Sequence, residues 1–244
     1  MYNLKEVKQT IFINIQTVSE YKSLKLLYNK KPKMYELWNK KMLMKYLKDR
    51  SKTMTDEELI KESIEYYSNK SWTFPEYGKI IGVSIGIVTY NKDYTQHKIN
   101  IKNIIKNNEE DIIKEFYGIL DEFKKNRDKI FLSGFNLKGN IIPYFCKRSV
   151  INNIPIHKMF DLKDVKPWES PFIDTMEMWR FGDFNFTPFE IMCGAIKVDC
   201  NMEYMDYGLF SSDYHAGKID DNHLAKIMEE NNIANINAFL KLNK

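Results

Sequence analysis

The sequence has few cysteines, no long apolar run and little net charge, and each shortage argues against a class of protein. The three cysteines, Cys146, Cys193 and Cys200, form no CxxC pair. We therefore expect buried free thiols rather than a disulfide framework or a cysteine zinc site. No apolar segment approaches the roughly 20 residues that a membrane-spanning helix needs, and residues 1–6 lack the apolar core of a signal peptide. We expect a cytoplasmic protein that does not bind membranes.

The net charge of +4, from 37 basic and 33 acidic residues, is too small to indicate nucleic-acid binding by itself, although it permits it. The four histidines show no metal-ligand spacing, and we expect them at the surface. Asn, Lys and Ile are abundant, as A/T-rich codons would produce. This composition suits a phage or virus protein, which would act in the host cytoplasm or in the virion.

Hydrophobic periodicity predicts an α/β protein. Strands are expected over 8–18, 79–90 and 130–133, with 98–101 as the hairpin partner of the second. Helices are expected over 109–125, 143–150, 187–196 and 224–242, and Thr55 precedes an acidic first turn as a helix N-cap does. We expect one domain over 1–244, in which a central mixed sheet is flanked by helices and 19–70 is a helical insertion after the first strand.

Four segments carry a family resemblance when they are taken in order. They read FINIQTV at 12–18, PEYGKI at 75–80 with VSIG at 83–86, GFNLKGNIIP at 134–143 followed by Lys147 and Arg148, and KPWE at 166–169 with DTMEMWRFG at 174–182. Together they resemble the 3′–5′ exonuclease family related to the proofreading domain of family-B DNA polymerases, within the RNase H-like (DnaQ-like, DEDD) superfamily. The resemblance covers about 8–242 and implies an RNase H-like fold.

The resemblance also implies a two-metal site, but each of its ligand positions is substituted. Members of the family hold two divalent metals with four carboxylates, and a tyrosine helps to position the attacking water. The carboxylate positions fall on Asn14, Gln16, Ile141 and Asn231, with a one-residue slip to Asn232 as the alternative for the last, and the tyrosine position falls on Ile227. Neutral amides hold Mg²⁺ poorly. We therefore expect no cofactor, or Mg²⁺ or Mn²⁺ if the protein is an active nuclease.

Other side chains near these positions can either restore a metal site or bind nucleic acid. Asp174 and Glu229 are the acids nearest to the lost ligands, although a helix cap and a solvent-exposed helix face are the simpler roles for them. The nucleic-acid-binding candidates are Thr17, Phe135, Asn136, Lys138 and Arg148, which offer charge for phosphates and a ring for unpaired bases. The lysine-rich stretch from Lys22 to Lys52 can face nucleic acid or a protein.

Three functions follow from these patterns. The first is a catalytically degenerate exonuclease-like protein that serves as a nucleic-acid-binding or assembly module, with single-stranded nucleic acid or a protein as its partner. The second is an active metal-dependent 3′–5′ exonuclease with non-standard ligands. The third is a structural module of a virion-like assembly, for which Tyr35, Trp38 and Tyr46 are candidate surface aromatics.

Overall fold

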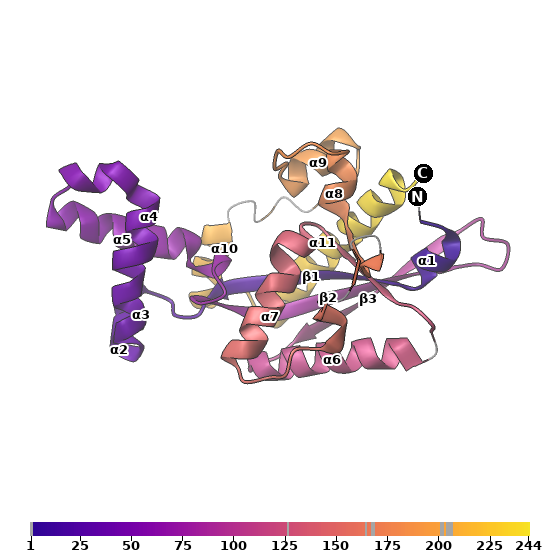
Figure 1. Cartoon of the computed structure of the whole chain (residues 1–244), viewed down its shortest axis with the longest axis horizontal. Coiled ribbons are helices and arrows are strands. Elements are labelled where there is room, and N and C mark those ends of the chain that lie inside the picture. The colour runs from indigo at the N-terminus through magenta and orange to yellow at the C-terminus, as the bar shows by residue number, and fades with distance from the viewer. Residues whose placement is uncertain (1, 126, 164, 167–168, 201–202, 204–206) are drawn as a thin grey trace. The chain divides into compact units, whose positions relative to one another are not determined.

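The computed structural model describes residues 2–125, 127–163, 165–166, 169–200, 203 and 207–244 (Figure 1). The chain forms two compact units. The sheet unit comprises Met1–Gln16, Ile80–Glu203 and Asp221–Lys244, and the helical unit comprises Thr17–Lys79 and Tyr204–Asp220. Segment 19–70, which we expected to be an insertion, lies within the helical unit. Of the sequence motifs, Pro167 and Trp168 fall outside the described residues.

A five-stranded mixed sheet has the order β3-β2-β1-β4-β5. Its strands are β1 (Thr10–Ser19), β2 (Gly78–Tyr90), β3 (His97–Ile105), β4 (Phe131–Gly134) and β5 (Phe172–Asp174). β2 pairs with β3 in the antiparallel sense, whereas β4 is parallel to both β1 and β5. The α/β class and the central mixed sheet flanked by helices are therefore confirmed. The three-residue β5 was not predicted, because so short a run carries no periodicity.

The alternation of side chains along β1 divides the core of the sheet unit into two clusters. Ile11 and Ile13 pack with α6 (Glu109–Lys125) and α7 (Ile142–Ile151). Phe12 points to the opposite face and packs with Ile236 and Phe239 of α11 (Asp221–Leu242). The α6, α7 and α11 helices lie where the sequence predicted helices.

The α11 helix lies close against β2 because β2 carries glycines at the contact. A Cβ atom added to Gly82 would lie 2.6 Å from Met228 Sδ, and one added to Gly86 would lie 2.6 Å from Ile236 Cδ1. The sheet unit also contains α1 (Leu4–Lys8), η4 (Leu137–Ile141), η5 (Lys158–Phe160), α8 (Thr175–Arg180) and α9 (Phe189–Ala195). The α9 helix corresponds to the one predicted over 187–196.

The helical unit is built around one tryptophan. Trp38 is fully buried, and its ring centroid lies 5.1 Å from that of Tyr67 and 4.9 Å from that of Tyr77. The expectation that Trp38 is a surface aromatic is therefore wrong, because its indole forms the core on which these rings pack. The elements of the helical unit are α2 (Leu24–Lys30), α3 (Pro32–Leu37), η1 (Trp38–Leu43), α4 (Met44–Leu47), η2 (Lys48–Thr53), α5 (Asp56–Lys70), η3 (Ser71–Thr73) and α10 (Tyr207–His215). Thr55 caps α5 as predicted, in a capping box with Glu58.

A buried ion pair joins α6, α7 and β2 in the sheet unit. The Arg148 guanidinium donates to both carboxylate oxygens of Glu109, and Nε lies 2.9 Å from Oε1. The same carboxylate accepts from Ile80 N at 2.7 Å and from Asn152 Nδ2 at 2.9 Å. Both side chains are over 90% buried. We expected Arg148 to contact phosphates, but its guanidinium is enclosed and held by Glu109.

We predict that Glu109→Ala lowers the free energy of unfolding by about 3–5 kcal/mol, because it leaves the Arg148 charge buried without compensation. Urea unfolding followed by circular dichroism measures this loss. Glu110→Ala is the matched control, because Glu110 is also in the first turn of α6 but its side chain is 42% exposed and pairs with the exposed Lys114. Its loss should be about 0.5 kcal/mol or less. Equal losses for the two variants would contradict a structural role for the buried pair.

Candidate functional site

Asn14 and Gln16 lie on the face of β1 that is covered by α11. They alternate with Ile13 and Ile15 and therefore share the face of Phe12, which packs against α11. Asn14 is half-buried, whereas Gln16 is only 4% exposed. The two polar residues that interrupt an apolar strand thus lie side by side on one face, beneath the helix that was expected to carry the last ligand position.

On α11 the residue that faces the sheet is Asn232. Its Nδ2 lies 3.3 Å from the carbonyl oxygen of Phe12 and 3.2 Å from Ser84 Oγ, and the side chain is fully buried. Asn231 is half-exposed. Asn232, the alternative for the last ligand position, is therefore the residue that faces the sheet, and Asn231 is not. An ionised carboxylate at 232 could not donate to the Phe12 carbonyl, so the contacts at this position favour an amide.

Further neutral polar side chains lie beside Asn232. Thr175 Oγ1 donates to Asn235 Oδ1 at 3.0 Å, and Ser133 is paired in register with Phe12. Among the described residues, Ser133 Oγ, Asn232 Oδ1 and Asn235 Nδ2 are buried without a hydrogen-bond partner. Each such atom costs about 1–3 kcal/mol. We call Ser84, Ser133, Thr175, Asn232 and Asn235 the polar seam.

The remaining substituted positions do not form part of the polar seam. Ile141 ends η4 and is 4% exposed, in the cluster that α6 and α7 cover. Ile227 is also buried, at 3% exposure. Within the described ranges, no three His, Cys, Asp or Glu side chains are grouped so that they could hold a metal ion. The structure thus brings Asn14, Gln16 and Asn232 to one face of the sheet and places Ile141 in the core of the other.

Asp174 and Glu229, which we considered as alternative metal ligands, lie in different environments. Asp174 is 3% exposed and caps α8, where Oδ1 accepts from Met176 N at 3.0 Å and Oδ2 accepts from Lys138 N at 2.9 Å. Burial raises the pKa of this carboxyl, and the two backbone donors oppose the rise. Glu229 is exposed on α11. The expected role of Asp174 as a helix cap is confirmed.

The proposed phosphate and base contacts are only partly accessible. Lys138 is partly exposed, and its Nζ lies 2.6 Å from Glu177 Oε2. Asn136 has a left-handed backbone with φ 52° at the start of η4, where its side chain lies too close to Gly139 for a Cβ atom there. Thr17 is buried, whereas Phe135 is half-buried.

The histidines and cysteines were predicted with mixed success. The expectation of surface histidines is wrong for His157, because it is 9% exposed and its ring Nδ1 accepts from Met159 N at 3.2 Å. His215 is half-buried, and burial lowers its pKa. All three cysteines are free, as expected, but Cys146 and Cys200 are half-buried rather than buried. Cys193 is buried, and burial raises the pKa of its thiol to about 12.

Sequence reasoning missed an aromatic surface next to Phe135. The loop from Phe181 to Phe189, which we call the aromatic loop, exposes Phe181 by 84%, Phe184 by 95% and Phe186 by 60%. The Phe135 ring centroid lies 5.0 Å from that of Phe189 and 6.5 Å from that of Phe186. The signal was present as the repeated phenylalanine in FGDFNFTPF, where Gly and Pro indicate a loop rather than a core element.

The backbone of the aromatic loop is held by its own polar groups. Phe181 and Gly182 both have positive φ, of 47° and 94°, and end α8. Asn185 N donates to Asp183 Oδ1 at 3.1 Å, and Arg180 Nε donates to the Asn185 carbonyl at 3.1 Å. The exposed rings are therefore carried on a turn with a defined conformation, which lowers the entropy lost when they bind.

The chain matches no known protein-family model, and no curated protein is detectably similar to it. Among the described residues, no helix is long and apolar enough to cross a membrane.

We predict that Asn232→Asp lowers the free energy of unfolding by about 3 kcal/mol or more, because it places a buried carboxylate against the Phe12 carbonyl. Asn231→Asp, one position earlier on the same helix, is the matched control and should change stability by less than about 1 kcal/mol. Chemical denaturation at pH 7 compares the two variants. A well-tolerated Asn232→Asp would show that the amide is not structurally required.

Proposed function

We propose that the protein is a catalytically degenerate relative of the RNase H-like 3′–5′ exonucleases, and that its sheet unit binds single-stranded nucleic acid without cleaving it. The ordered motifs and the mixed sheet support the kinship. In this sheet β1 is central, β4 and β5 are parallel to it on one side, and α11 covers the face that carries Asn14 and Gln16. This is the arrangement that we expect of an RNase H-like sheet.

The loss of catalysis is supported by what occupies the ligand positions. Two divalent ions need anionic oxygens to compensate their charge. Asn14 and Gln16 offer only neutral oxygens, Ile141 offers none, and the Asn232 amide is used to attach α11 to β1 and β2. Substitutions have thus replaced charge with neutral contacts, one of which now holds the helix on the sheet.

The aromatic loop is the single observation that carries the binding role. Phe181, Phe184 and Phe186 present bare rings to solvent, which is unusual for side chains of this size. Unpaired bases stack on such rings with about 1–3 kcal/mol per base and little sequence preference. Because Phe135 directly follows β4 and contacts this loop, the surface adjoins the segment that was expected to bind substrate.

The same rings can instead contact a protein, which is the structural-module alternative. Salt dependence separates the two partners, because phosphate contacts release counterions and stacking on a protein side chain does not. Of the two cations that were candidate phosphate contacts, Arg148 is enclosed by Glu109 and Lys138 is paired with Glu177. We therefore expect a shallow slope of log K against log salt, of about −1 to −2 at roughly −0.7 per phosphate contact.

We predict that the double variant Phe184→Ala/Phe186→Ala binds fluorescein-labelled oligo(dT) at least tenfold more weakly than the unchanged protein, because it removes two stacking surfaces. Fluorescence anisotropy at two salt concentrations measures both the affinity and the slope. Ile191→Ala is the control, since Ile191 is an equally exposed apolar residue on α9 that cannot stack. Phe184→Trp/Phe186→Trp should retain binding. Undetectable binding by the unchanged protein would overturn the proposal.

We also predict that the protein does not shorten 5′-labelled single-stranded DNA in Mg²⁺ or Mn²⁺, and that Asn14→Asp/Gln16→Glu does not restore cleavage. Two acids on β1 still lack their counterparts at Ile141 and Asn232. Denaturing gel electrophoresis detects any laddering, with EDTA as the control. Laddering that EDTA abolishes would support the active-exonuclease alternative, and Asp174→Ala and Glu229→Ala would then identify the acids in use.

A further inference from the structure

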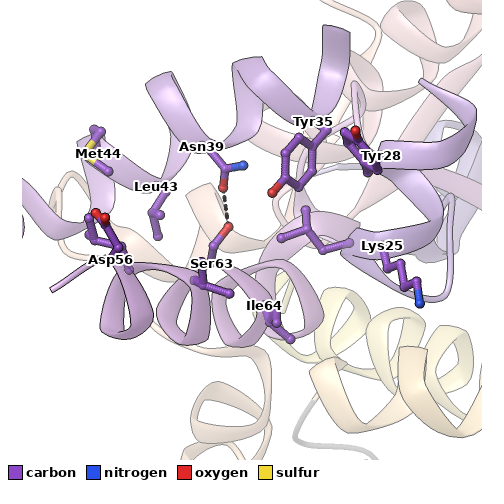
Figure 2. A pocket seen from close by; sticks show the side chains of 12 residues that line it. Lys25, Tyr28, Tyr35, Asn39, Leu43, Met44, Asp56, Ser63 and Ile64 are labelled. Atoms are coloured by element: carbon purple, nitrogen blue, oxygen red, sulfur yellow. Dashed lines mark hydrogen bonds between the residues drawn. The ribbon is translucent and has the colours of Figure 1, made fainter. Parts of the chain in front are cut away.

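The helical unit contains an open groove between α5 on one side and α2, α3, η1 and α4 on the other (Figure 2). Its volume is about 620 Å³, within the range of about 300–1,000 Å³ that is typical of binding pockets. The groove is lined by Leu24, Lys25, Tyr28, Tyr35, Asn39, Leu43, Met44, Asp56, Leu59, Ile60, Ser63 and Ile64. All of these residues belong to the helical unit.

The floor of the groove is apolar and is crossed by one polar pair. Leu24 and Leu43 are buried, and Ser63 Oγ donates to Asn39 Oδ1, as Figure 2 shows. The hydrogen bond uses the oxygen of the Asn39 amide. Figure 2 shows Lys25, Tyr28 and Tyr35 toward one end and Met44 and Asp56 toward the other.

The rims of the groove are apolar and solvent-exposed. Ile60 is 60% exposed and Ile64 is 54% exposed on α5, while Tyr28 is 55% exposed on α2. Ile60 and Ile64 are spaced i, i+4, so they follow one line along α5. A small molecule on the floor would leave these side chains in water, whereas a helix laid along the groove would cover both rims.

The charge beside the groove indicates the sign of the occupant. Residues 22–52, which include one wall of the groove, contain eleven Lys or Arg and two Asp or Glu, a net charge of +9. The opposite wall, α5, carries five Asp or Glu and two Lys, a net charge of −3, so 22–70 as a whole has a net charge of +6. Lys25, on the groove itself, is exposed and has no carboxylate within 4 Å among the described residues. The occupant should therefore carry acidic side chains toward the Lys25 end.

We propose that this groove is the docking site for an acidic amphipathic helix of a partner protein. The helix would place apolar side chains at i, i+3 or i+4 and i+7 on the floor and carry carboxylates beside Lys25. This is the helix-in-groove mode of recognition. The site is separate from the aromatic loop and does not depend on the nucleic-acid role proposed above.

The test uses three fluorescein-labelled peptides of about 14 residues. The first has leucines at helical spacing and glutamates on its polar face, the second has lysines in place of the glutamates, and the third is a scrambled form of the first. Anisotropy with the full chain should show at least tenfold tighter binding of the acidic amphipathic peptide than of the other two. Equal binding of the scrambled peptide would overturn the proposal.

Variants of the chain locate the site. Ile60→Glu/Ile64→Glu should weaken binding of the acidic peptide at least tenfold, and both positions are exposed enough to accept the change without unfolding. Val150→Glu, at an exposed apolar position on α7, is the control and should bind as the unchanged protein does. Lys25→Glu should reverse the preference between the acidic and lysine peptides. An unchanged preference would contradict the assigned role of Lys25.

Two further measurements separate other occupants. Unlabelled oligo(dT) should not displace the acidic peptide from the unchanged protein, and competitive displacement would mean that the groove belongs to a nucleic-acid surface. Light scattering should give the same mass for the unchanged protein and for Ile60→Glu. If the unchanged protein were a dimer and Ile60→Glu a monomer, a second copy of the chain would occupy the groove. Either outcome would overturn the proposal.

Discussion

The sheet unit depends on a single strand that is buried on both of its faces. β1 sends Ile11 and Ile13 into the cluster with α6 and α7, and Phe12 into the cluster with α11. A strand packed on both sides can carry polar side chains only where a partner or a solvent opening receives them. Asn14 and Gln16 lie where the apolar run of β1 ends. The packing of the apolar residues of β1 therefore fixes where these two polar side chains are placed, and with them the position of any site on this face.

The polar seam beneath α11 differs from the metal site that the motifs imply. An exonuclease of this family concentrates negative charge where β1 meets the last helix. Here the same region holds neutral amides and hydroxyls, and the Asn232 amide donates to the backbone of β1. Uncharged groups are cheaper to bury than carboxylates, yet Ser133, Asn232 and Asn235 each keep an unpartnered atom. Under the proposal of a catalytically degenerate exonuclease, polar groups without charge are what we expect a former metal site to retain.

The two units present different surfaces to partners. In the sheet unit, the aromatic loop exposes the flat rings of Phe181, Phe184 and Phe186, which are suited to stacking. In the helical unit, the groove combines apolar rims with a net positive stretch, which favours an acidic helix. A protein with both surfaces could hold a nucleic acid and a protein at the same time, which is the behaviour of an assembly module.

The sequence by itself determined the α/β class, most strand and helix positions and the N-cap at Thr55, because these depend on local periodicity and residue type. It also determined that the positions where the resemblance implies metal ligands carry uncharged residues. Only the tertiary structure decided that Arg148 is buried against Glu109, that Trp38 is core, that Asn232 rather than Asn231 faces the sheet, and that the phenylalanines of 181–189 are exposed. Each depends on which surface another element covers, and a local pattern of residue types does not contain that information. An arginine or an aromatic ring can lie at the surface, or in a core that supplies its partners, and residue type alone does not decide between the two.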